Sequence, residues 1–512
     1  MTELSHLRER FGERLLEAPE RRAPYEIPER GAPGRAAAVL VPRDAGEVQA
    51  ALETANQDAL HYVLCAGRTG LVEAQRPDGE IVLSLERLKR VLRVELAGGA
   101  SCDLSAAADA DAARDRLFAW WSERGRPATE GLVVEAEAGV AVDTLNGILA
   151  PLGRMFPMEM GSTATASVGA CVSNASAGAN AVCYGTAAHM ADAAFGFWGR
   201  GADAGTSRSE PWSRPAPTTL AIDSTRLPEA WGLIGTQGVF GVVTRVRLKT
   251  HAIPAQREGA MVVVGDMAEA MALFERARAE FGADIEEYEF LSRSSLGLVV
   301  KHRGADVRLP FESLPDAPYA VLLQVKSEDR DADLSQRLYE FMSGRAGLPD
   351  EAIGYAPLPA LKKIRHSVTE SSNLEMRALG GGRLSFDTAT PVAVFGEYLD
   401  RLARELAAAR PDVQLVAFGH AGVGGAHLHL IGGAGAPVAP DAARLTTLVF
   451  DVTQACGGTY SAEHGVGPKW ADEFLRRTPK ERLARLAARK RECDPKNVVQ
   501  PRSFGFDRML RA

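Results

Sequence analysis

Three of the ten histidines in this 512-residue chain lie in one short stretch, FGHAGVGGAHLHLI at 418–431. The end of this stretch alternates polar and apolar residues, as in a β-strand whose side chains point to opposite faces in turn. His427 and His429 would therefore share one face, while the apolar residues between them face a core. His420 precedes a glycine-rich turn that could fold it back beside the other two.

A second cluster follows in SAEHGVG, where Glu463 and His464 are neighbours. Two histidines and a glutamate around an open position form a ligand set that binds divalent metals. A further histidine outside that set would be free to act as a base near neutral pH. Spacing alone leaves an alternative open, in which these histidines only make hydrogen bonds in a core or on the surface.

Glycine-rich segments form another kind of candidate site. They are CAGRTGLV at 65–72, a run of small residues at 161–186, and IGTQGVFG at 234–241. Each alone is compatible with an ordinary turn, but glycines also let a backbone approach a ligand closely. Three such segments together predict a large ligand that is held by backbone N–H groups.

Several common motifs are absent from the sequence. It contains no GxxxxGK[ST] phosphate loop, no HExxH and no GxSxG. The glycines at 235, 238 and 241 lead into a predicted strand, whereas a Rossmann dinucleotide site needs a helix at that point. The large ligand must therefore be bound by another kind of fold.

Composition narrows the class of protein further. The net charge of −7 and the lack of a long Lys/Arg block disfavour nucleic-acid binding. The first residues are charged, and no apolar run is long enough to span a membrane. We therefore expect a cytoplasmic protein, with contact to the surface of the inner membrane left open. The six cysteines form no C-x-x-C pair, which predicts free thiols and no iron–sulfur cluster.

The elements that position these residues begin with a helical arm at 1–34 that ends in a proline-containing linker. An α/β region follows, in which one helix shows a clear apolar face. Its strands are at 38–43, 61–65 and 80–86, and its helix is at 45–58, with Val48, Ala51, Leu52 and Ala55 on one face.

Residues from about 97 to 130 interrupt this pattern with an Ala- and Asp-rich stretch that precedes Trp120 and Trp121. This predicted insertion is either a surface excursion that contacts a partner or, as we favour, a helix that buries its tryptophans. Strands should follow at 131–136 and 240–248, separated by a Ser-, Pro- and Asp-rich loop at 202–228.

From about residue 256, strands and helices alternate in an α+β pattern. We expect an antiparallel sheet with helices on one side. The strands are at 261–264, 285–291, 319–325 and 413–418, and the helices are at 266–281, 331–345, 393–409 and 470–491.

Five motifs, in order, resemble those of the FAD-linked oxidases of the vanillyl-alcohol oxidase type. CAGRTGLV, MEMGSTATASVGACVSNASAG, IGTQGVFGVVT, FGHAGVGGAHLHLI and SAEHGVG carry the resemblance, and DPKNVVQP near the end is similar to the family's D-P-x-x-x-x-N-P. The nearest likeness is to the D-2-hydroxyacid dehydrogenases, which include D-lactate and D-2-hydroxyglutarate dehydrogenases and the FAD subunit of glycolate oxidase. This implies an α+β fold, with a two-subdomain FAD-binding domain of the PCMH type and a cap domain whose antiparallel sheet is covered by helices.

The resemblance also implies domain boundaries and cofactor contacts. The FAD-binding domain would span 35–255, the substrate or cap domain 256–455, and a returning C-terminal segment 456–512. FAD would be non-covalent, because Arg68 stands in the loop without a matching histidine. The implied FAD contacts are Ala66, Gly67, Arg68, Thr69, Gly70, Leu71, Met160, Gly161, Ser162, Ser167, Val168, Gly169, Gly238, Gly241, Val243, Glu463 and Gln500.

In metal-dependent relatives the histidines of this motif bind the ion. By resemblance, His420, His427 and Glu463 would bind zinc, manganese or iron, and His464 would be the base. LKKIRHSVTES is similar to the segment that supplies an Arg and a Thr to the substrate carboxylate, here Arg365 and Thr369.

The pocket departs from the family pattern at several positions. Val423-Gly424-Gly425 replaces Asp-Gly-Asn, His429 replaces an Asn, and Ser385 stands where a substrate-binding Lys is usual. The identity of the substrate is therefore the least constrained part of the resemblance.

The implied function is oxidation of a small D-2-hydroxy acid, such as D-lactate, glycolate or D-2-hydroxyglutarate. Electrons would leave through a separate acceptor, namely a quinone, a cytochrome or an electron-transfer flavoprotein. The alternatives are oxidation of another alcohol by the same fold, a non-catalytic flavoprotein subunit, and a metal-dependent hydrolase that uses the His/Glu cluster alone. A homodimer is left open.

Overall fold

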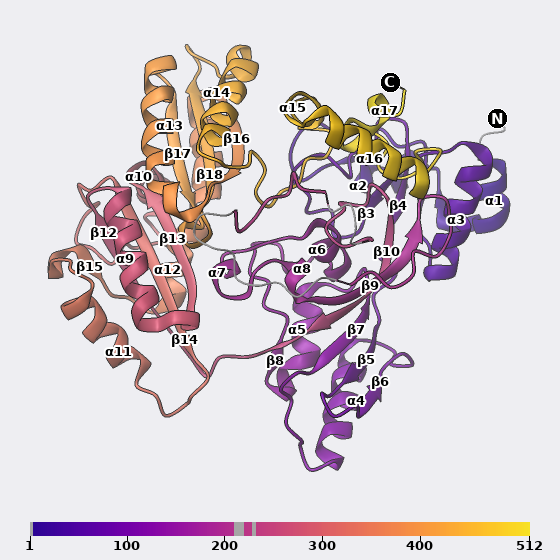
Figure 1. Cartoon of the computed structure of the whole chain (residues 1–512), viewed down its shortest axis with the longest axis horizontal. Coiled ribbons are helices and arrows are strands. Elements are labelled where there is room, and N and C mark those ends of the chain that lie inside the picture. Colours follow the sequence, from indigo (N-terminus) through magenta and orange to yellow (C-terminus); the bar gives the residue numbers. More distant parts are fainter. Residues whose placement is uncertain (1–3, 209–219, 228–231, 512) are drawn as a thin grey trace.

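The computed structural model of the chain describes residues 4–208, 220–227 and 232–511. Figure 1 shows a unit built on one large sheet at the left and a unit with smaller sheets at the right. Residues 209–219 and 228, which belong to the predicted loop, lie outside the described residues. Among the described helices, none is both long and apolar enough to cross a membrane.

The first sheet has the strand order β1-β2-β4-β3, with β2, β4 and β3 parallel and β1 antiparallel at the edge. The predicted face of helix α3 is buried, and the Asp44 side chain caps its first turn. The arm is helical, as predicted, with helices α1 and α2, but it also contains strand β1. The bounds are α1 (Ser5–Phe11), β1 (Leu15–Leu16), α2 (Pro19–Glu26), β2 (Val39–Leu40), α3 (Ala45–Asp58), β3 (Tyr62–Cys65) and β4 (Ile81–Ser84).

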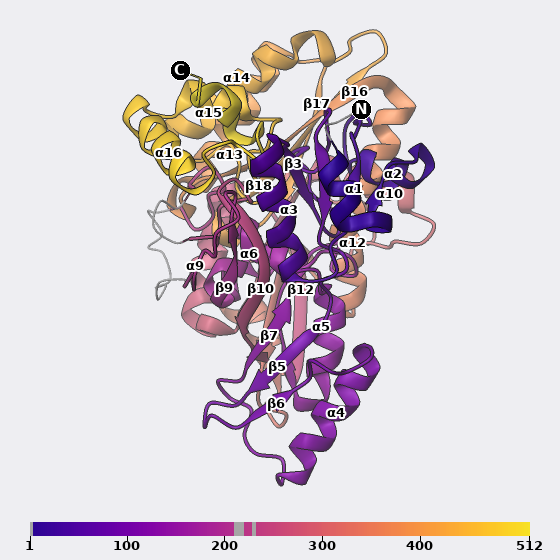
Figure 2. The same ribbon diagram turned by 90° about the vertical axis from the view of Figure 1, so that its right-hand side faces the viewer.

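A second, antiparallel sheet has the order β6-β5-β7-β10-β9. Residues 101–123 form its edge strand and a helix, which lie at the foot of the molecule in Figure 2. This helix, α4, buries Leu117 and packs Trp120 and Trp121 partly against the core, so the helix alternative for this stretch holds. The bounds are β5 (Val91–Glu95), β6 (Ser101–Asp103), α4 (Ala110–Glu123), β7 (Val133–Glu137), α5 (Val142–Leu149), β9 (Ala191–Trp198) and β10 (Gly241–Lys249).

The run of small residues forms short helices that press against neighbouring backbone. A Cβ on Gly169 would lie 2.4 Å from the Cβ of Ala138, and one on Gly178 would lie 2.2 Å from the Glu159 carbonyl oxygen. Small side chains are therefore required here by packing as well as by any ligand. The helices are α6 (Val168–Asn174), α7 (Ala181–Tyr184) and α8 (Ala187–Met190), and a small ladder joins β8 (Arg154–Met155) to β11 (His251–Ala252).

The large sheet is entirely antiparallel and has the order β15-β12-β14-β13-β17-β18-β16. Its strands are β12 (Gln256–Val264), β13 (Ile285–Ser292), β14 (Tyr319–Ser327), β15 (Ile353–Gly354), β16 (Gly380–Ala389), β17 (Gln414–Gly419) and β18 (Gly425–Gly433).

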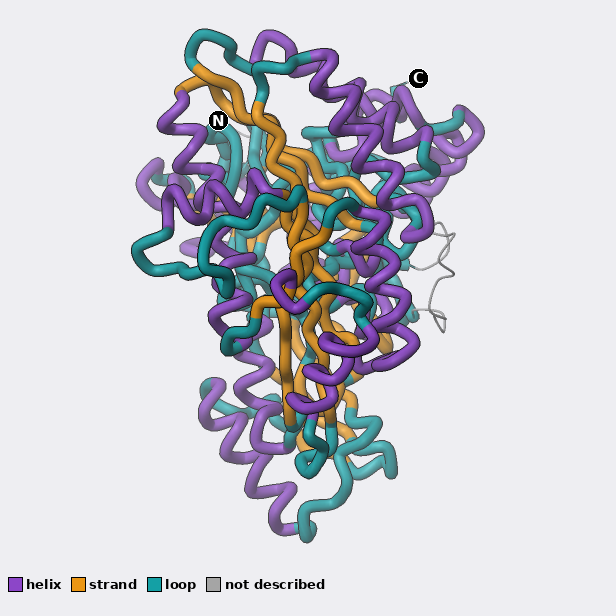
Figure 3. Tube along the Cα trace, turned by 90° about the vertical axis from the view of Figure 1, so that its left-hand side faces the viewer, coloured by secondary structure: helices purple, strands orange, loops and turns teal. Residues whose placement is uncertain are grey.

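Helices cover both faces of this sheet, so the expectation of helices on one side only is wrong. Consecutive residues of β14 are buried, with Leu323 in one core and Leu322 in the other. Figure 3 shows the strands running between helices on either side. One face packs on α9 (Met267–Phe281), α11 (Leu334–Glu340), α13 (Phe395–Ala409) and α14 (Ala442–Ala455), and the other on α10 (Arg293–Arg303) and α12 (Leu358–Leu379).

The C-terminal segment lies beside the N-terminal elements in Figure 1. The single helix predicted at 470–491 is two helices, because Thr478 and Pro479 interrupt it. The tail then pairs with β3, since the Gln500 N–H donates to the Tyr62 carbonyl at 2.8 Å. The helices are α15 (Ala471–Arg477), α16 (Lys480–Cys493) and α17 (Phe506–Met509).

Candidate active site

A cavity of about 740 Å³ is bounded by all three glycine-rich segments and by the histidine cluster. Its lining comes from both units, because β16, β17, β18 and α12 face the glycine-rich loops across it. It contains most of the residues predicted from sequence. These are Ala66, Gly67, Arg68, Thr69, Gly70, Leu71, Met160, Gly161, Ser162, Ser167, Gly169, Gly238, Val243, Arg365, Thr369, His420, His427, Glu463, His464 and Gln500.

Two predicted contacts do not line the cavity. Val168 is fully buried in the core of the smaller-sheet unit. Gly241 begins β10, where an added Cβ would lie 2.3 Å from the Phe197 carbonyl oxygen. Both residues are therefore explained by packing.

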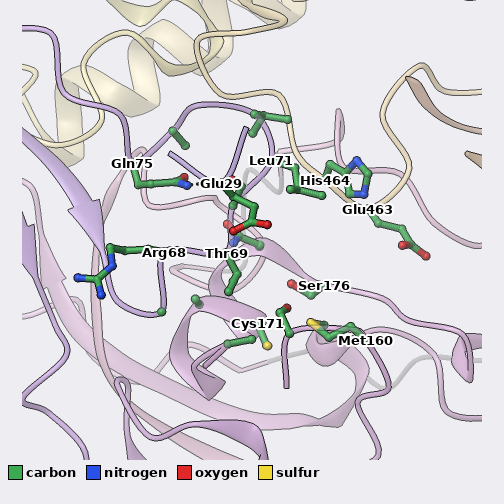
Figure 4. A pocket seen from close by; sticks show the side chains of 18 of the residues that line it. Glu29, Arg68, Thr69, Leu71, Gln75, Met160, Cys171, Ser176, Glu463 and His464 are labelled. Carbon is green, nitrogen blue, oxygen red and sulfur yellow. Dashed lines mark hydrogen bonds between the residues drawn. The ribbon is translucent and has the colours of Figure 1, made fainter. Parts of the chain in front are cut away.

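The loop at 65–72 is folded tightly at the cavity wall. A Cβ on Gly67 would come within 2.0 Å of the Thr165 carbonyl oxygen. Arg68 adopts a positive φ of 59°, and its guanidinium lies 5.0 Å from the ring centre of Tyr25 in the arm. Figure 4 shows this side chain extending away from Thr69 and Met160, so Arg68 offers its backbone to the cavity.

The predicted metal ligands are brought together. His420 Nε2 lies 3.3 Å from His427 Nε2 and 3.5 Å from Glu463 Oε1. All three ligand atoms lie within 4.8 Å of one another. Glu463 Oε1 is buried, and no residue in the described part of the chain gives it a hydrogen bond. A buried, unpartnered carboxylate oxygen facing two imidazoles is a donor set that suits a cation.

Glu289 on β13 organises this cluster, although no motif pointed to it. It is fully buried, accepts from His420 Nδ1 at 2.5 Å and accepts from Arg365 Nε at 2.6 Å. Burial alone would raise the pKa of Glu289, but the charges of His420 and Arg365 outweigh it and hold that pKa at about 2. The only signal in the sequence is a strand, IEEYEFL, with three carboxylates among apolar residues.

The carboxylates of Glu289 and Glu463 stabilise positive charge at the histidine cluster. Burial works to lower the pKa of His420, yet Glu289 and Glu463 together raise it to about 10. Because Glu289 occupies Nδ1, the Nε2 atom of His420 is the one directed at His427. A carboxylate behind a ligating histidine is the usual way in which such rings are oriented.

Asp387 on β16 holds the other side of the cluster. Its carboxylate accepts the backbone N–H groups of Glu463 and His464, each at 2.8 Å, and lies 3.5 Å from His464 Nδ1. The rings of His427 and His464 are stacked, with centres 5.4 Å apart. Burial lowers the pKa of His464 against the opposing charge of Asp387, so a neutral ring is available as a base. Asp387, His427 and His464 form a second possible metal grouping.

Arg365 and Thr369 lie one turn apart on α12, and both line the cavity. Arg365 is buried, and its guanidinium lies 4.8 Å from the ring centre of Phe418. The Nε atom of Arg365 donates to Glu289, and the terminal nitrogens of Arg365 form no hydrogen bond within the described residues. The free edge of the guanidinium can therefore bind a carboxylate.

Two family profiles match the chain. The C-terminal domain of FAD linked oxidases matches residues 253–503, and an FAD binding domain matches 36–114 and 126–194. The chain belongs to the FAD-linked oxidases. The break at 115–125 begins inside α4, ends just after it and is shorter than the predicted insertion.

Curated relatives of this oxidase are distant but align along most of their length. A mitochondrial D-2-hydroxyglutarate dehydrogenase from Arabidopsis thaliana is 23% identical and covers 91% of this chain and 75% of its own length. A D-2-hydroxyglutarate dehydrogenase from Xanthomonas citri pv. viticola is also 23% identical, with 91% and 88% covered.

Solved structures confirm the fold of this oxidase. A substrate-bound p-cresol methylhydroxylase aligns with a TM-score of 0.67 at 13% identity, over 98% of this chain and 96% of that one. The predicted fold class is therefore confirmed, and the chain is an FAD-linked oxidoreductase. FAD fits the cavity, because the volume is in the range of cofactor sites and residues from all three glycine-rich segments line it.

Proposed function

We propose that this oxidase converts a D-2-hydroxy acid to the 2-oxo acid with the help of a divalent metal. The observation that carries the proposal is the convergence of His420, His427 and Glu463 with His464 and Arg365 on one cavity wall. The names of the relatives, which are hydroxy-acid dehydrogenases, support the same substrate class.

His420, His427 and Glu463 are the best candidates to hold zinc, manganese or iron. Glu463 has a free buried oxygen, whereas Asp387 of the second grouping already accepts two backbone N–H groups. A bound divalent metal lowers the pKa of a coordinated hydroxyl group.

His464 would accept the proton of the substrate hydroxyl. Its neutral ring stacks beside His427, so it lies next to the place where that hydroxyl would bind. Arg365 would pair with the substrate carboxylate, and Thr369 would add a hydroxyl contact one turn away. Bound FAD would supply the acceptor for the hydride that leaves the substrate Cα.

The cofactor would be non-covalent and would pass its electrons to a separate acceptor. The loop at 65–72 carries Arg68 and contains no histidine that could form a covalent bond with the flavin. The six cysteines form no disulfide in the described part of the chain, and their sequence has no C-x-x-C pair that would suit an internal iron–sulfur relay. A quinone, a cytochrome or an electron-transfer flavoprotein therefore remains our proposed acceptor. The cytoplasmic location and the homodimer stay predictions.

The test is anaerobic bleaching of the bound flavin by a panel of D- and L-2-hydroxy acids, with and without a chelator. We expect bleaching by D-acids, and loss of bleaching when the metal is removed. His464→Gln should keep FAD and lose flavin reduction by about 10²–10⁴-fold. His6→Gln, at an exposed position remote from the cavity, is the matched control. A colourless protein, or a His464→Gln variant that still reduces flavin at the wild-type rate, would overturn the proposal.

A further inference from the structure

Three cations lie beside the proposed site, where Glu29, Glu73 and Asp387 offset only part of the charge of Arg30 and Lys469. Arg30 follows helix α2 of the arm, Lys469 precedes α15, and Arg383 lies on β16. Arg30 and Lys469 line the same cavity as the histidine cluster. Within the described residues none of the three is in an ion pair. Figure 4 shows Glu29, the arm residue before Arg30, in the same pocket as His464 and Leu71.

The register of the sheet directs one of these cations towards the site. Ser385 pairs with His429 and Asp387 pairs with His427 across β16 and β18. Arg383, Ser385 and Asp387 therefore share the face that carries the histidines, because alternate residues of a strand point the same way. Alternate residues of a strand are about 7 Å apart, so Arg383 lies further along this face of β16 from Asp387 than Ser385 does. Ser385, which lies between Arg383 and Asp387 on this face, lines the cavity.

Unsatisfied polar atoms mark the same place. Arg383 Nη1 and His429 Nδ1 are buried, and neither has a hydrogen-bond partner in the described part of the chain. His429 is 3% exposed and lines the cavity. Arg383 Nη1 is a donor, and His429 Nδ1 is a donor or an acceptor depending on its tautomer. Buried polar atoms normally have a hydrogen-bond partner, so the missing partners point to a group supplied from outside the chain.

The positive charges of Arg30, Arg383 and Lys469 also favour binding of an anion. Burial and then Arg30 lower the pKa of Arg383 to about 10. Desolvation by the surrounding protein atoms, and then the charge of Arg30, lower the pKa of Lys469 to about 8. Part of the Lys469 side chain is nevertheless exposed to solvent. Mutual repulsion of this kind is relieved when an anion binds between the cations.

We propose that Arg30, Arg383 and Lys469 form a second anion subsite, which selects hydroxy acids that carry a second negative group at the far end. The inference rests on the proposed function, in which Arg365 binds the first carboxylate. The distal group would be an anionic oxyacid, either a carboxylate or a phosphate, because guanidinium and ammonium groups bind both.

Flavin reduction by matched substrates tests this subsite. D-2-hydroxyglutarate and D-3-phosphoglycerate carry the two kinds of distal anion, and D-2-hydroxyvalerate carries none. We expect one of the dianions to exceed hydroxyvalerate in kcat/KM by about 10–100-fold, and Arg30→Gln and Arg383→Gln to remove most of that preference. Hydroxyvalerate turnover should change little in these variants. Arg10→Gln, on an exposed part of the same arm, is the matched control.

A binding measurement separates the subsite from the chemistry. Glutarate and valerate lack the hydroxyl, so titration of the FAD-loaded protein with each compares the distal groups without turnover. Tighter binding of glutarate that is lost in Arg383→Gln supports the subsite even if no hydroxy acid bleaches the flavin. Equal binding of the two acids, or equal kcat/KM for charged and uncharged substrates, would overturn it. Loss of FAD from the variants would assign the cations to the cofactor and would also overturn it.

Discussion

At the scale of single residues, two buried carboxylates determine how the histidines are presented. Glu289 holds one ring from behind, and Asp387 holds the backbone of the segment that carries Glu463 and His464. The histidines supply the atoms that would touch a metal or a substrate, but the carboxylates decide where those atoms point.

Replacing Glu289 with Gln should weaken both ends of the site. The amide cannot balance the charges of His420 and Arg365, so we expect metal affinity to fall by about 10–100-fold while FAD stays bound. Metal content after dialysis and the apparent KM for the hydroxy acid measure the two effects. Glu286→Gln is the matched control, because Glu286 is equally buried on β13 and pairs with Arg257 away from the cavity. Equal metal loss in both variants would show that Glu289 acts only through stability.

Residue types and spacing pointed to the histidines and the glycine-rich loops that line the cavity, but not to the residues that position them. Glu289 is separated from Arg365 by 76 positions and from His420 by 131, so only the folded sheet reveals the contacts. Val168 and Gly241 show that a residue of a matching motif need not line the cavity. They belong to the resembling motifs, yet the structure uses them for packing.

At the scale of elements, regular alternation was a reliable guide. It placed His427 and His429 on one face of β18, opposite Leu428 and Leu430 in the core. Helix α12, which presents Arg365, carries no prediction because its buried face includes Ser367, Ser371, Ser372 and Glu375 beside its apolar residues. A helix that buries polar side chains lacks the apolar stripe on which sequence patterns depend.

The glycine loop offers a prediction at this scale. Gly67→Ala would force a Cβ against the Thr165 carbonyl, so we expect a cost of about 1–3 kcal/mol and loss of FAD. Gly147→Ala is the matched control, since an exposed glycine in α5 with nothing within 4 Å should gain up to about 1 kcal/mol. Thermal unfolding and the flavin absorbance of the purified proteins give both quantities. A Gly67→Ala variant with normal FAD content would show that the loop can move aside.

At the scale of the whole molecule, the two units meet where β10 leads through β11 into β12. His251 of β11 contacts Tyr184 edge to face, with ring centres 4.9 Å apart, and pairs in register with Met155 of β8. Lys326 of the large sheet and Arg154 of β8 both act on this ring. A positive charge on His251 would thus lie close to cations from both units, Arg154 and Lys326.

This junction should make the protein sensitive to mild acid. Burial, followed by Arg154, lowers the pKa of His251 from 6.5 to about 4. Between pH 6.5 and about pH 4, His251 is protonated in the unfolded chain but neutral in the folded chain. The free energy of unfolding therefore falls as the pH falls through this range. One pKa unit is about 1.4 kcal/mol, which limits the loss to about 3 kcal/mol by pH 4. His251→Phe keeps an aromatic ring against Tyr184 and cannot titrate. Its unfolding free energy, measured in urea from pH 8 to pH 4.5, should run parallel to the wild type above pH 7 and fall less steeply below pH 6.5. Parallel curves throughout would show that His251 accepts its proton in the folded protein as readily as in the unfolded chain.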